Sequence, residues 1–332
     1  MEFALKDSRL TEEQEAITDI SDLSGVGPIT AGKLKAAGFD SVEAIAVAPV
    51  RELVEKASLE SSVAHKIVKA ARETIHTDFV TAKQLWEKRK DLKRLNLGSS
   101  NLDTLLGGGL ETQAITEFVG EFGTGKSQIC MTASIRTQLP EEKGGLNGKV
   151  LFIDTEGTFA AQRVYQIAQA SGHDPEKILE GIIYSRVYNS DHQILSVDHA
   201  FKVCQEENIK LMIVDSVMSH FRGEYIGRES LAERQQRLNS HLHKLARIAQ
   251  TLNLAVIITN QVQANPQAFF GDPTRPAGGN ILAHASTHRV MLRKASGGIR
   301  VAKVFDSPYL PESEAYFQIT EKGVEDAQAK GK

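Results

Sequence analysis

Residues 120–127 limit the possible folds of this chain more than any other segment. They read GEFGTGKS and fit the pattern GxxxxGK[ST], between the apolar run AITEFV and the helix-like run SQICMTASIRTQL. Glycines in such a loop let successive backbone N–H groups turn inward around phosphate groups, and the N-terminus of the following helix adds a favourable dipole. The order strand, loop, helix therefore predicts a phosphate-binding loop in an α/β domain.

Two side chains of this loop have distinct expected roles. Lys126 is placed for the β- and γ-phosphates of a nucleotide, and the hydroxyl of Ser127 is placed for Mg²⁺. The segment thus predicts ATP and Mg²⁺ as cofactors. The other residues of this segment that we expect to contact the nucleotide are Gly120, Glu121, Phe122, Gly123, Thr124, Gly125 and Gln128.

Three more apolar runs predict further strands of the same sheet. They cover residues 149–154, 209–215 and 254–259 and alternate with long helical stretches, which is typical of a doubly wound, mainly parallel sheet. The carboxyl ends of such strands point at the ligand crevice. Toward the C-terminus, strand-like runs separated by glycine and proline predict an antiparallel extension of the sheet edge.

Polar residues follow these three strands. Glu156 can deprotonate a water that attacks the γ-phosphate, and Asp215 can hold Mg²⁺ through water. Gln261 is a neutral amide that can report on the γ-phosphate. A plainer interpretation of each also exists, a helix cap for Glu156 and a polar strand end for Gln261. The order of the motifs along the chain favours the nucleotide site.

Residues from 20 to about 77 have a different pattern of apolar and polar residues. Short amphipathic helices alternate with turns and no strand signal occurs, which predicts a small all-α domain. The turn SGVGP at 24–28 is typical of a helix-hairpin-helix, in which Gly25 and Gly27 expose backbone N–H groups to a DNA phosphate. A plain turn between two helices is an equally open interpretation. The second hairpin, over residues 57–66, has no glycine, which indicates weak binding of duplex DNA.

These changes of pattern divide the chain into five parts. Residues 79–95 carry 6 basic and 2 acidic side chains, which fits a linker or a solvated helix face. The predicted parts are a disordered acidic tail over 1–19, the helix-hairpin-helix domain over 20–77, a polymerisation motif and basic linker over 78–95, the ATPase core over 96–325 and a disordered tail over 326–332.

Composition excludes several classes of protein. With 39 Lys and Arg against 42 Asp and Glu, the chain is not a histone-like polycation, although a local basic patch can still bind nucleic acid. Cys130 and Cys204 form neither a disulfide framework nor a zinc site. No apolar run approaches the roughly 18 residues of a membrane helix, and the acidic first twenty residues do not fit a signal peptide. We therefore expect a cytoplasmic, nucleoid-associated protein without membrane contact.

Several segments together resemble the family of archaeal RadA recombinases and their eukaryotic strand-exchange relatives, cousins of bacterial RecA. The matching segments occur in the family's order over roughly residues 20–325. They are residues 20–39, 106–128, 150–159, 187–193, 221–236, 256–262, 278–290 and 302–323. The resemblance implies a RecA-like P-loop ATPase core after a helix-hairpin-helix domain, and ATP-dependent DNA strand exchange.

The resemblance also implies further nucleotide contacts. Arg163 would stack on the adenine, and residues 306–311 would form a cap over ATP bound to the neighbouring subunit, with a monovalent cation near Asp306. The family pattern TEGTFRPER has an Arg-Pro pair where this chain has Ala160 and Ala161, although Arg163 stays in place. The residues of this cap that we expect to contact nucleotide are Asp306, Pro308 and Pro311.

Two loops match the DNA-binding loops of the family. In the first, over 221–237, Arg222, Arg228 and Arg234 suit a phosphodiester backbone, whose contacts carry no sequence information. Arg228 is the first candidate among them, and an exposed helix with ion pairs is the alternative. The second loop, over 263–279, is long, and such loops are often functional. Single-stranded and double-stranded DNA are the expected partners.

Phe79 and Ala82 match the FxxA element with which family members plug into a neighbour's ATPase domain. Phe can fill an apolar pocket, Ala permits a close backbone approach, and strand addition would satisfy the linker N–H groups. A phenylalanine packed within its own chain is the plainer alternative. A head-to-tail contact of this kind makes a helical filament or a ring. We therefore expect self-association, together with accessory recombination mediators.

The leading hypothesis for function is an ATP-dependent recombinase that forms a filament on single-stranded DNA and catalyses homologous pairing and strand exchange in repair. A recombinase paralogue that acts as an ATP-binding mediator is the first alternative. A RecA-like hexameric helicase is the second. The N-terminal domain, the FxxA element and both loops favour the recombinase over the paralogue, and the cap motif counts against the helicase.

Overall fold

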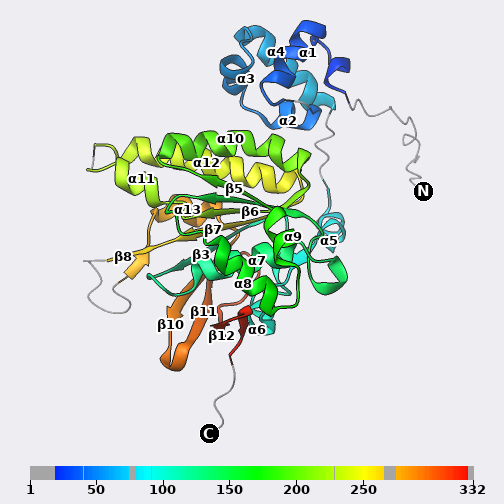
Figure 1. Cartoon of the computed structure of the whole chain (residues 1–332). Coiled ribbons are helices and arrows are strands. Elements are labelled where there is room, and N and C mark those ends of the chain that lie inside the picture. Colours follow the sequence, from blue (N-terminus) through cyan, green and yellow to red (C-terminus); the bar gives the residue numbers. More distant parts are fainter. Residues whose placement is uncertain are drawn as a thin grey trace, which may run out of the picture. The chain divides into compact units, whose positions relative to one another are not determined.

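The computed structural model describes residues 19–39, 41–74, 80–90, 92–227, 229–264 and 274–327 (Figure 1). The chain divides into two compact units, Met1–Trp86 and Glu87–Lys332. No helix in these described ranges combines the length and the apolar character needed to cross a membrane.

The first unit is helical, as its sequence pattern predicts. Its largest helix, α4, buries Ala64, Ile67, Val68 and Ala71, a spacing that places all four on one face. Leucine, isoleucine and valine side chains of the other helices complete one small core around them. The described elements of this unit are η1 (Ile20–Asp22), α1 (Pro28–Ala36), α2 (Val42–Val47), α3 (Val50–Lys56) and α4 (Ser61–Thr74).

The segment predicted as a linker contains regular structure. Helix α5 (Ala82–Lys90) has exposed side chains at its described positions, which agrees with the alternative of a solvated helix face. Strand β1 (Arg94–Leu95) then pairs antiparallel with β2 (Leu110–Glu111). At the other end of the chain, the predicted tail begins one residue too early. Asp326 is the last residue of a strand, and its carboxylate accepts hydrogen bonds from the Ser99 and Ser100 hydroxyls.

A nine-stranded sheet forms the centre of the second unit, in the order β13-β12-β11-β10-β3-β7-β6-β4-β5. The strands from β10 to β5 run parallel, and β11, β12 and β13 extend the sheet in antiparallel pairs, which confirms the predicted mainly parallel sheet with its C-terminal extension. The strand bounds are β3 (Ile115–Gly120), β4 (Lys149–Asp154), β5 (Ile182–Arg186), β6 (Ile209–Asp215), β7 (Ala255–Asn260), β10 (His288–Lys294), β11 (Ile299–Asp306), β12 (Ser313–Thr320) and β13 (Gly323–Asp326).

Helices cover both faces of this sheet, which explains why its central strands are mostly apolar and are buried along nearly their whole length. On one face α7 packs with Phe118, Phe152 and Ile213. On the other face α10, α12 and α13 pack with Val214, Val256 and Ile258. Figure 1 shows α10 and α12 side by side over one face, with α7 and α8 on the opposite side. The helix bounds are α6 (Ser100–Leu105), α7 (Lys126–Thr137), η2 (Glu141–Lys143), α8 (Ala161–Ala170), α9 (Pro175–Glu180), α10 (Ser190–Glu206), α11 (Ser219–Glu224), α12 (Leu231–Thr251), α13 (Gly279–Ala285) and η3 (Ser296–Gly298).

A short hairpin base follows the carboxyl end of β7. Strands β8 (Val262–Ala264) and β9 (Thr274–Pro276) pair antiparallel, with Val262 opposite Pro276. The chain thus leaves the nine-stranded sheet after Asn260 and rejoins it at His288 of β10, after α13. This hairpin base lies next to the candidate site described below.

Candidate nucleotide and nucleic-acid site

A cleft of about 1030 Å³ lies at the carboxyl ends of β3, β4, β6 and β7. This is the edge at which ligands bind in open α/β sheets. The cleft is lined by twelve of the residues expected from the sequence, and Thr124, which is buried, does not line it. The twelve are Gly120, Glu121, Phe122, Gly123, Gly125, Lys126, Ser127, Gln128, Glu156, Arg163, Asp215 and Gln261.

The phosphate loop is held in shape by its glycines and by Lys126. Gly125 has a φ of 110°, and a Cβ atom there would come within 2.9 Å of Ile319 Cδ1, so a side chain would be strained and crowded. Lys126 Nζ donates hydrogen bonds to the carbonyl oxygens of Gly120 (2.7 Å) and Glu121 (2.9 Å). Burial lowers the pKa of Lys126, while the nearby carboxylates raise it. Lys126 thus ties the loop together through two carbonyl oxygens, and it also lines the cleft.

Oxygen donors for a divalent cation lie beside the loop. Ser127 Oγ donates a hydrogen bond to Asp215 Oδ2 (2.7 Å), and the Thr259 hydroxyl donates to the other carboxylate oxygen. Burial raises the pKa of Asp215, whereas these two hydrogen bonds lower it. Hydroxyl and carboxylate oxygens are the ligands that Mg²⁺ prefers, so this pair of residues fits the ion.

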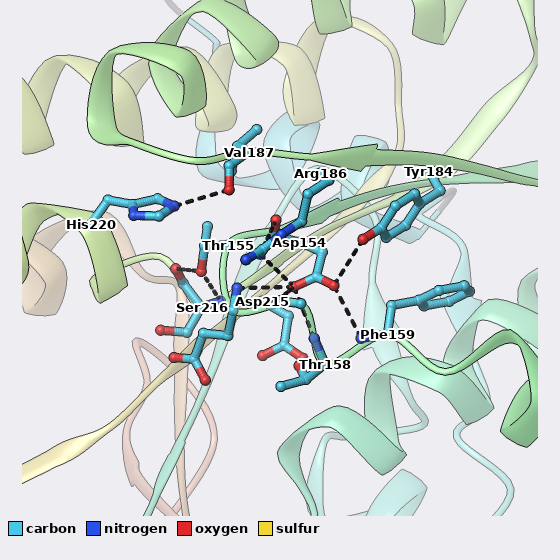
Figure 2. Close-up of polar contacts among 12 residues, drawn as sticks. Asp154, Thr155, Thr158, Phe159, Tyr184, Arg186, Val187, Asp215, Ser216 and His220 are labelled. Atoms are coloured by element: carbon cyan, nitrogen blue, oxygen red, sulfur yellow. Dashed lines mark hydrogen bonds and ion pairs between the residues drawn. The ribbon is translucent and has the colours of Figure 1, made fainter.

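Glu156 is held at the cleft by the buried carboxylate of Asp154, the last residue of β4. Figure 2 shows the Asp154 carboxylate with Tyr184, Arg186 and Phe159 around it. This carboxylate accepts hydrogen bonds from four successive backbone N–H groups, those of residues 156–159, at 2.7–3.3 Å. The Tyr184 hydroxyl donates to it at 3.1 Å, and Arg186 pairs with it at 3.5 Å. Asp154 thus fixes the turn that carries Glu156, a function that its place in an apolar strand does not reveal.

We expect Asp154→Asn to destabilise the folded protein by about 2–3 kcal/mol, because the amide presents a donor where buried N–H groups need an acceptor. Tyr184→Phe removes only one of the donors and is expected to cost about 1 kcal/mol or less. Urea unfolding of the two variants measures the difference. Equal losses of stability would mean that the backbone contacts of Asp154 contribute little.

Gln261 and Glu156 are in direct contact across the cleft. Gln261 Nε2 donates a hydrogen bond to Glu156 Oε1 at 2.9 Å, although the two residues lie 105 positions apart. Both side chains border the same cavity as Lys126. A γ-phosphate and its attacking water would therefore meet a carboxylate and an amide together.

Arg163 also reaches the cleft, from the first turn of α8. Its Nε donates to Gln128 Oε1 at 3.0 Å, and its terminal nitrogens donate to backbone carbonyls of Thr320 and Glu321. The preceding Ala160 forms the N-cap of α8 without a side-chain hydrogen bond. The helix therefore begins at Ala161 without the family's Arg-Pro pair.

The predicted cap and the phosphate loop lie at opposite ends of the strands. The loop follows the carboxyl end of β3, and the cap lies near the amino ends of β3 and β10. Asp306 ends β11, where it pairs with Arg289 at the start of β10, and that end of β10 lies beside Thr116 at the start of β3. Asp306, Pro308 and Pro311 accordingly do not line this cleft. One chain does not bring its own cap and phosphate loop together.

Arg300 is a cleft residue that no pattern in the sequence indicates. It lies in β11, lines the cleft, and its buried Nε has no hydrogen-bond partner among the described residues. A basic residue in a strand near the sheet edge looks like an ordinary solvated position. Only the packing of β11 beside the phosphate loop reveals it.

The residues predicted to contact DNA have different outcomes. Arg222 is exposed in α11 and lines a smaller cavity, about 270 Å³, that also includes Gln261. Arg234 lies in the first turn of α12 and is half-buried. Arg228 lies outside the described residues. Arg237, in the same segment, is held by Asp191 and by the Tyr225 hydroxyl, so it is an ion-paired helix residue.

The remaining predicted residues belong to the first unit and to the linker. Gly25 has a φ of 90° in the turn before α1, and Gly27 is the N-cap of α1, as a helix-hairpin-helix requires. Ala82 begins α5 and is exposed. Phe79 lies outside the described residues.

Comparisons with known proteins match this chain along almost its whole length. Residues 88–327 match the Rad51 family model, and residues 17–73 match the model of a SAM-like helix-hairpin-helix tandem. The chain is similar to two archaeal proteins that are both called DNA repair and recombination protein RadA. It is 51% identical over 317 residues to that of Aeropyrum pernix and 50% identical over 325 residues to that of Ignicoccus hospitalis. Each match covers 96% of this chain and 99% of the relative.

Proposed function

The chain belongs to the Rad51 family of DNA repair and recombination proteins, and from this premise we propose that it forms an ATP-controlled filament on single-stranded DNA and catalyses homologous pairing and strand exchange. One observation carries the proposal for its chemistry. Lys126, the Ser127–Asp215 pair and the Glu156–Gln261 pair converge on a single cleft. These are the groups that binding and cleavage of a nucleoside triphosphate require.

We assign the steps of hydrolysis to this chain's residues as follows. Lys126 and the backbone N–H groups of the loop bind the β- and γ-phosphates and orient them. Ser127 and, through water, Asp215 would hold Mg²⁺, which neutralises developing charge on the phosphate oxygens. Glu156 accepts a proton from the attacking water, and Gln261, bonded to Glu156, senses the γ-phosphate. Arg163 stacks on the adenine.

The proposed assembly rests on the positions of the cap segment and the phosphate loop, which lie at opposite ends of the strands. Because residues 306–311 lie at the edge opposite the phosphate loop, they can cap only the nucleotide of another copy. Among the described residues β5 is the last strand on one side of the sheet, so we assign its outer edge to strand addition by the Phe79–Ala82 element of a neighbour. A monovalent cation beside the half-exposed carboxylate of Asp306 is part of the same proposal.

DNA binding is assigned to the two loops and to the N-terminal turn. Arg222, Arg228 and Arg234 would hold the phosphodiester backbone without reading its sequence. Arg222 shares its cavity with Gln261, which supports a link between DNA occupancy and the γ-phosphate. Gly25 and Gly27 would offer backbone N–H groups to duplex DNA. Accessory mediators and a place beside the nucleoid in the cytoplasm complete the proposal.

A strand-exchange assay on homologous DNA substrates, with ATP omitted as the control, tests this function. We expect ATP-dependent product and, in electron micrographs with ATP and single-stranded DNA, extended filaments. Nucleotide binding without exchange would instead indicate a mediator. Closed rings that unwind duplex DNA would indicate a helicase.

We expect Phe79→Glu to leave a folded protein that no longer assembles, because a carboxylate placed in an apolar pocket without a partner costs more than the roughly 2–7 kcal/mol that a hydroxyl or amide costs there. Sedimentation in the presence of ATP measures assembly. The matched control is Val80→Glu, which adds the same charge at the next position, where the native side chain is 41% exposed. Long filaments of the Phe79 variant would place Phe79 within its own chain and contradict the assembly role.

A further inference from the structure

Glu117 is a carboxylate in the middle of the sheet core. It lies in β3 with no exposed surface, on the strand face that packs toward α12 and α13. Arg289 of β10 is its direct partner in the parallel register, and Asp306 of β11 is the partner of Arg289. The three residues therefore form a row across three adjacent strands.

The row is connected by ionic contacts. Arg289 Nε donates to Glu117 Oε2 at 2.6 Å, and Arg289 NH1 lies 3.7 Å from Asp306 Oδ2. The guanidinium also lies over the ring of Phe305, 4.8 Å from its centroid. Arg289 is 7% exposed, whereas the Asp306 side chain is 51% exposed. The row thus runs from the core to the surface segment proposed as the cap.

The second oxygen of Glu117 faces the nucleotide side. Glu117 Oε1 accepts a hydrogen bond from Asn260 Nδ2 at 2.8 Å, and the same nitrogen donates to the carbonyl oxygen of Ala277 at 2.7 Å. Asn260 Oδ1 accepts from the backbone N–H of Gln261 at 2.8 Å, and the Ala277 N–H donates to the Gln261 carbonyl at 2.9 Å. Asn260 therefore joins the two ends of the hairpin base formed by β8 and β9.

Only a carboxylate accepts from both Arg289 and Asn260. Arg289 and Asn260 each present a donor, so the group between them needs an acceptor on both oxygens. Burial raises the pKa of Glu117, and the Arg289 guanidinium lowers it. A buried ion pair seldom stabilises a fold more than apolar side chains of the same size would. A role in fixing geometry accounts better for charges at this place.

We propose that Glu117 and Arg289 are positioning residues that connect the two functional edges of the sheet. Through Asn260 they hold Gln261 and the hairpin base at the chain's own nucleotide cleft, and through Asp306 they hold the cap segment for a neighbour's nucleotide. The polar path is Gln261, Asn260, Glu117, Arg289 and Asp306.

The expected effect on turnover rests on the role proposed for Gln261 in hydrolysis. The test therefore also includes hydrogen exchange, a readout that is independent of that role. Hydrogen exchange of the nucleotide-free protein reports on the Gln261 and Ala277 amides. In Glu117→Gln one of the two donors loses its acceptor, and we expect these amides to exchange about tenfold faster or more. The second readout is ATP hydrolysis, where we expect kcat to fall about tenfold and KM to stay unchanged, because Lys126 and Ser127 lie outside the path.

Two further variants keep the test decisive. Asp198→Asn breaks an ion pair with Lys244 in which each side chain is 19% exposed. Neither residue belongs to the path, so this variant controls for a general loss of stability. Arg289→Lys retains both charges in the core, but an ammonium can hold either Glu117 or Asp306 and not both. We expect Arg289→Lys to raise the exchange rate of the same amides by a smaller factor than Glu117→Gln does. If Glu117→Gln does not fold, Arg289→Lys takes its place in the test.

The outcomes separate the two ideas. Faster exchange confined to Gln261 and Ala277, absent in Asp198→Asn and accompanied by the fall in kcat, supports the positioning path. Faster exchange with wild-type kcat retains the path and overturns the role of Gln261 in hydrolysis. Wild-type exchange at both amides in Glu117→Gln and Arg289→Lys overturns the inference.

Discussion

Lys126→Ala is expected to lower the affinity for ATP about a hundredfold or more, since hydrogen bonds to charged groups contribute about 1.5–3 kcal/mol each. In the structure the Lys126 ammonium donates to two loop carbonyls, at 2.7 and 2.9 Å, and it borders the cavity that phosphates would fill. Its removal takes away the cation that meets the triphosphate and also loosens the loop that surrounds it.

Equilibrium titration with a slowly hydrolysed ATP analogue and Mg²⁺ measures this effect. Lys303→Ala is the matched control, because Lys303 is a half-exposed cation that pairs with Glu312 and does not line the cleft. Its affinity should stay at the wild-type value. An affinity of Lys126→Ala within about threefold of wild type, less than 1 kcal/mol, would show that the backbone N–H groups hold the phosphates alone.

The fold and the centre of the nucleotide site could be predicted because their signals are local. A phosphate loop is eight consecutive residues between a strand and a helix. Asp215 is the last residue of an apolar strand, and Glu156 and Gln261 come within two residues after the end of one. In a parallel sheet, carboxyl ends gather at one edge whatever the order of the strands. The prediction that these residues lie together at one cleft therefore did not depend on the order of the strands.

The supporting polar groups could not be predicted, because their partners lie far away along the chain. Glu117 contacts Arg289 at a separation of 172 residues and Asn260 at 143. In the sequence Glu117 and Arg289 look like polar interruptions of strands, and Asn260 looks like a polar strand end. Asp154 likewise looks like an ordinary strand end, although it binds four backbone N–H groups. Such pairings depend on strand order and register, which local patterns do not contain.

The direction of β11 decides where the cap lies. The sequence predicts an antiparallel hairpin from β10 to β11, and an antiparallel strand returns to the amino edge of the sheet. That single turn sends residues 306–311 away from the chain's own phosphate loop. In the proposed role as a cap, these residues can therefore reach only the nucleotide of a second copy. The roles of Phe79 and Arg228, which lie outside the described residues, stay predictions from the sequence.

Glu156→Gln is expected to reduce ATP hydrolysis about a thousandfold, within the range that a general base contributes, while ATP affinity stays near the wild-type value. Glutamine retains an oxygen that can accept the 2.9 Å hydrogen bond from Gln261, and Asp154 still fixes the backbone of the turn. The geometry of the cleft is thus kept, and only the capacity to take a proton from water is lost.

Two measurements on the same preparation test this separation of binding from chemistry. Titration with ATP and Mg²⁺ gives the affinity, and single-turnover hydrolysis with single-stranded DNA gives the chemical step. Glu314→Gln, a carboxylate of β12 that pairs with Arg293 and does not line the cleft, controls for the loss of one negative charge. Since Lys126 acts on the bound phosphates and Glu156 only on the attacking water, the Lys126 variant should lose affinity and the Glu156 variant should lose turnover. Equal losses of affinity in the two variants would contradict both assignments, and hydrolysis by Glu156→Gln within about tenfold of wild type would show that another group takes the proton.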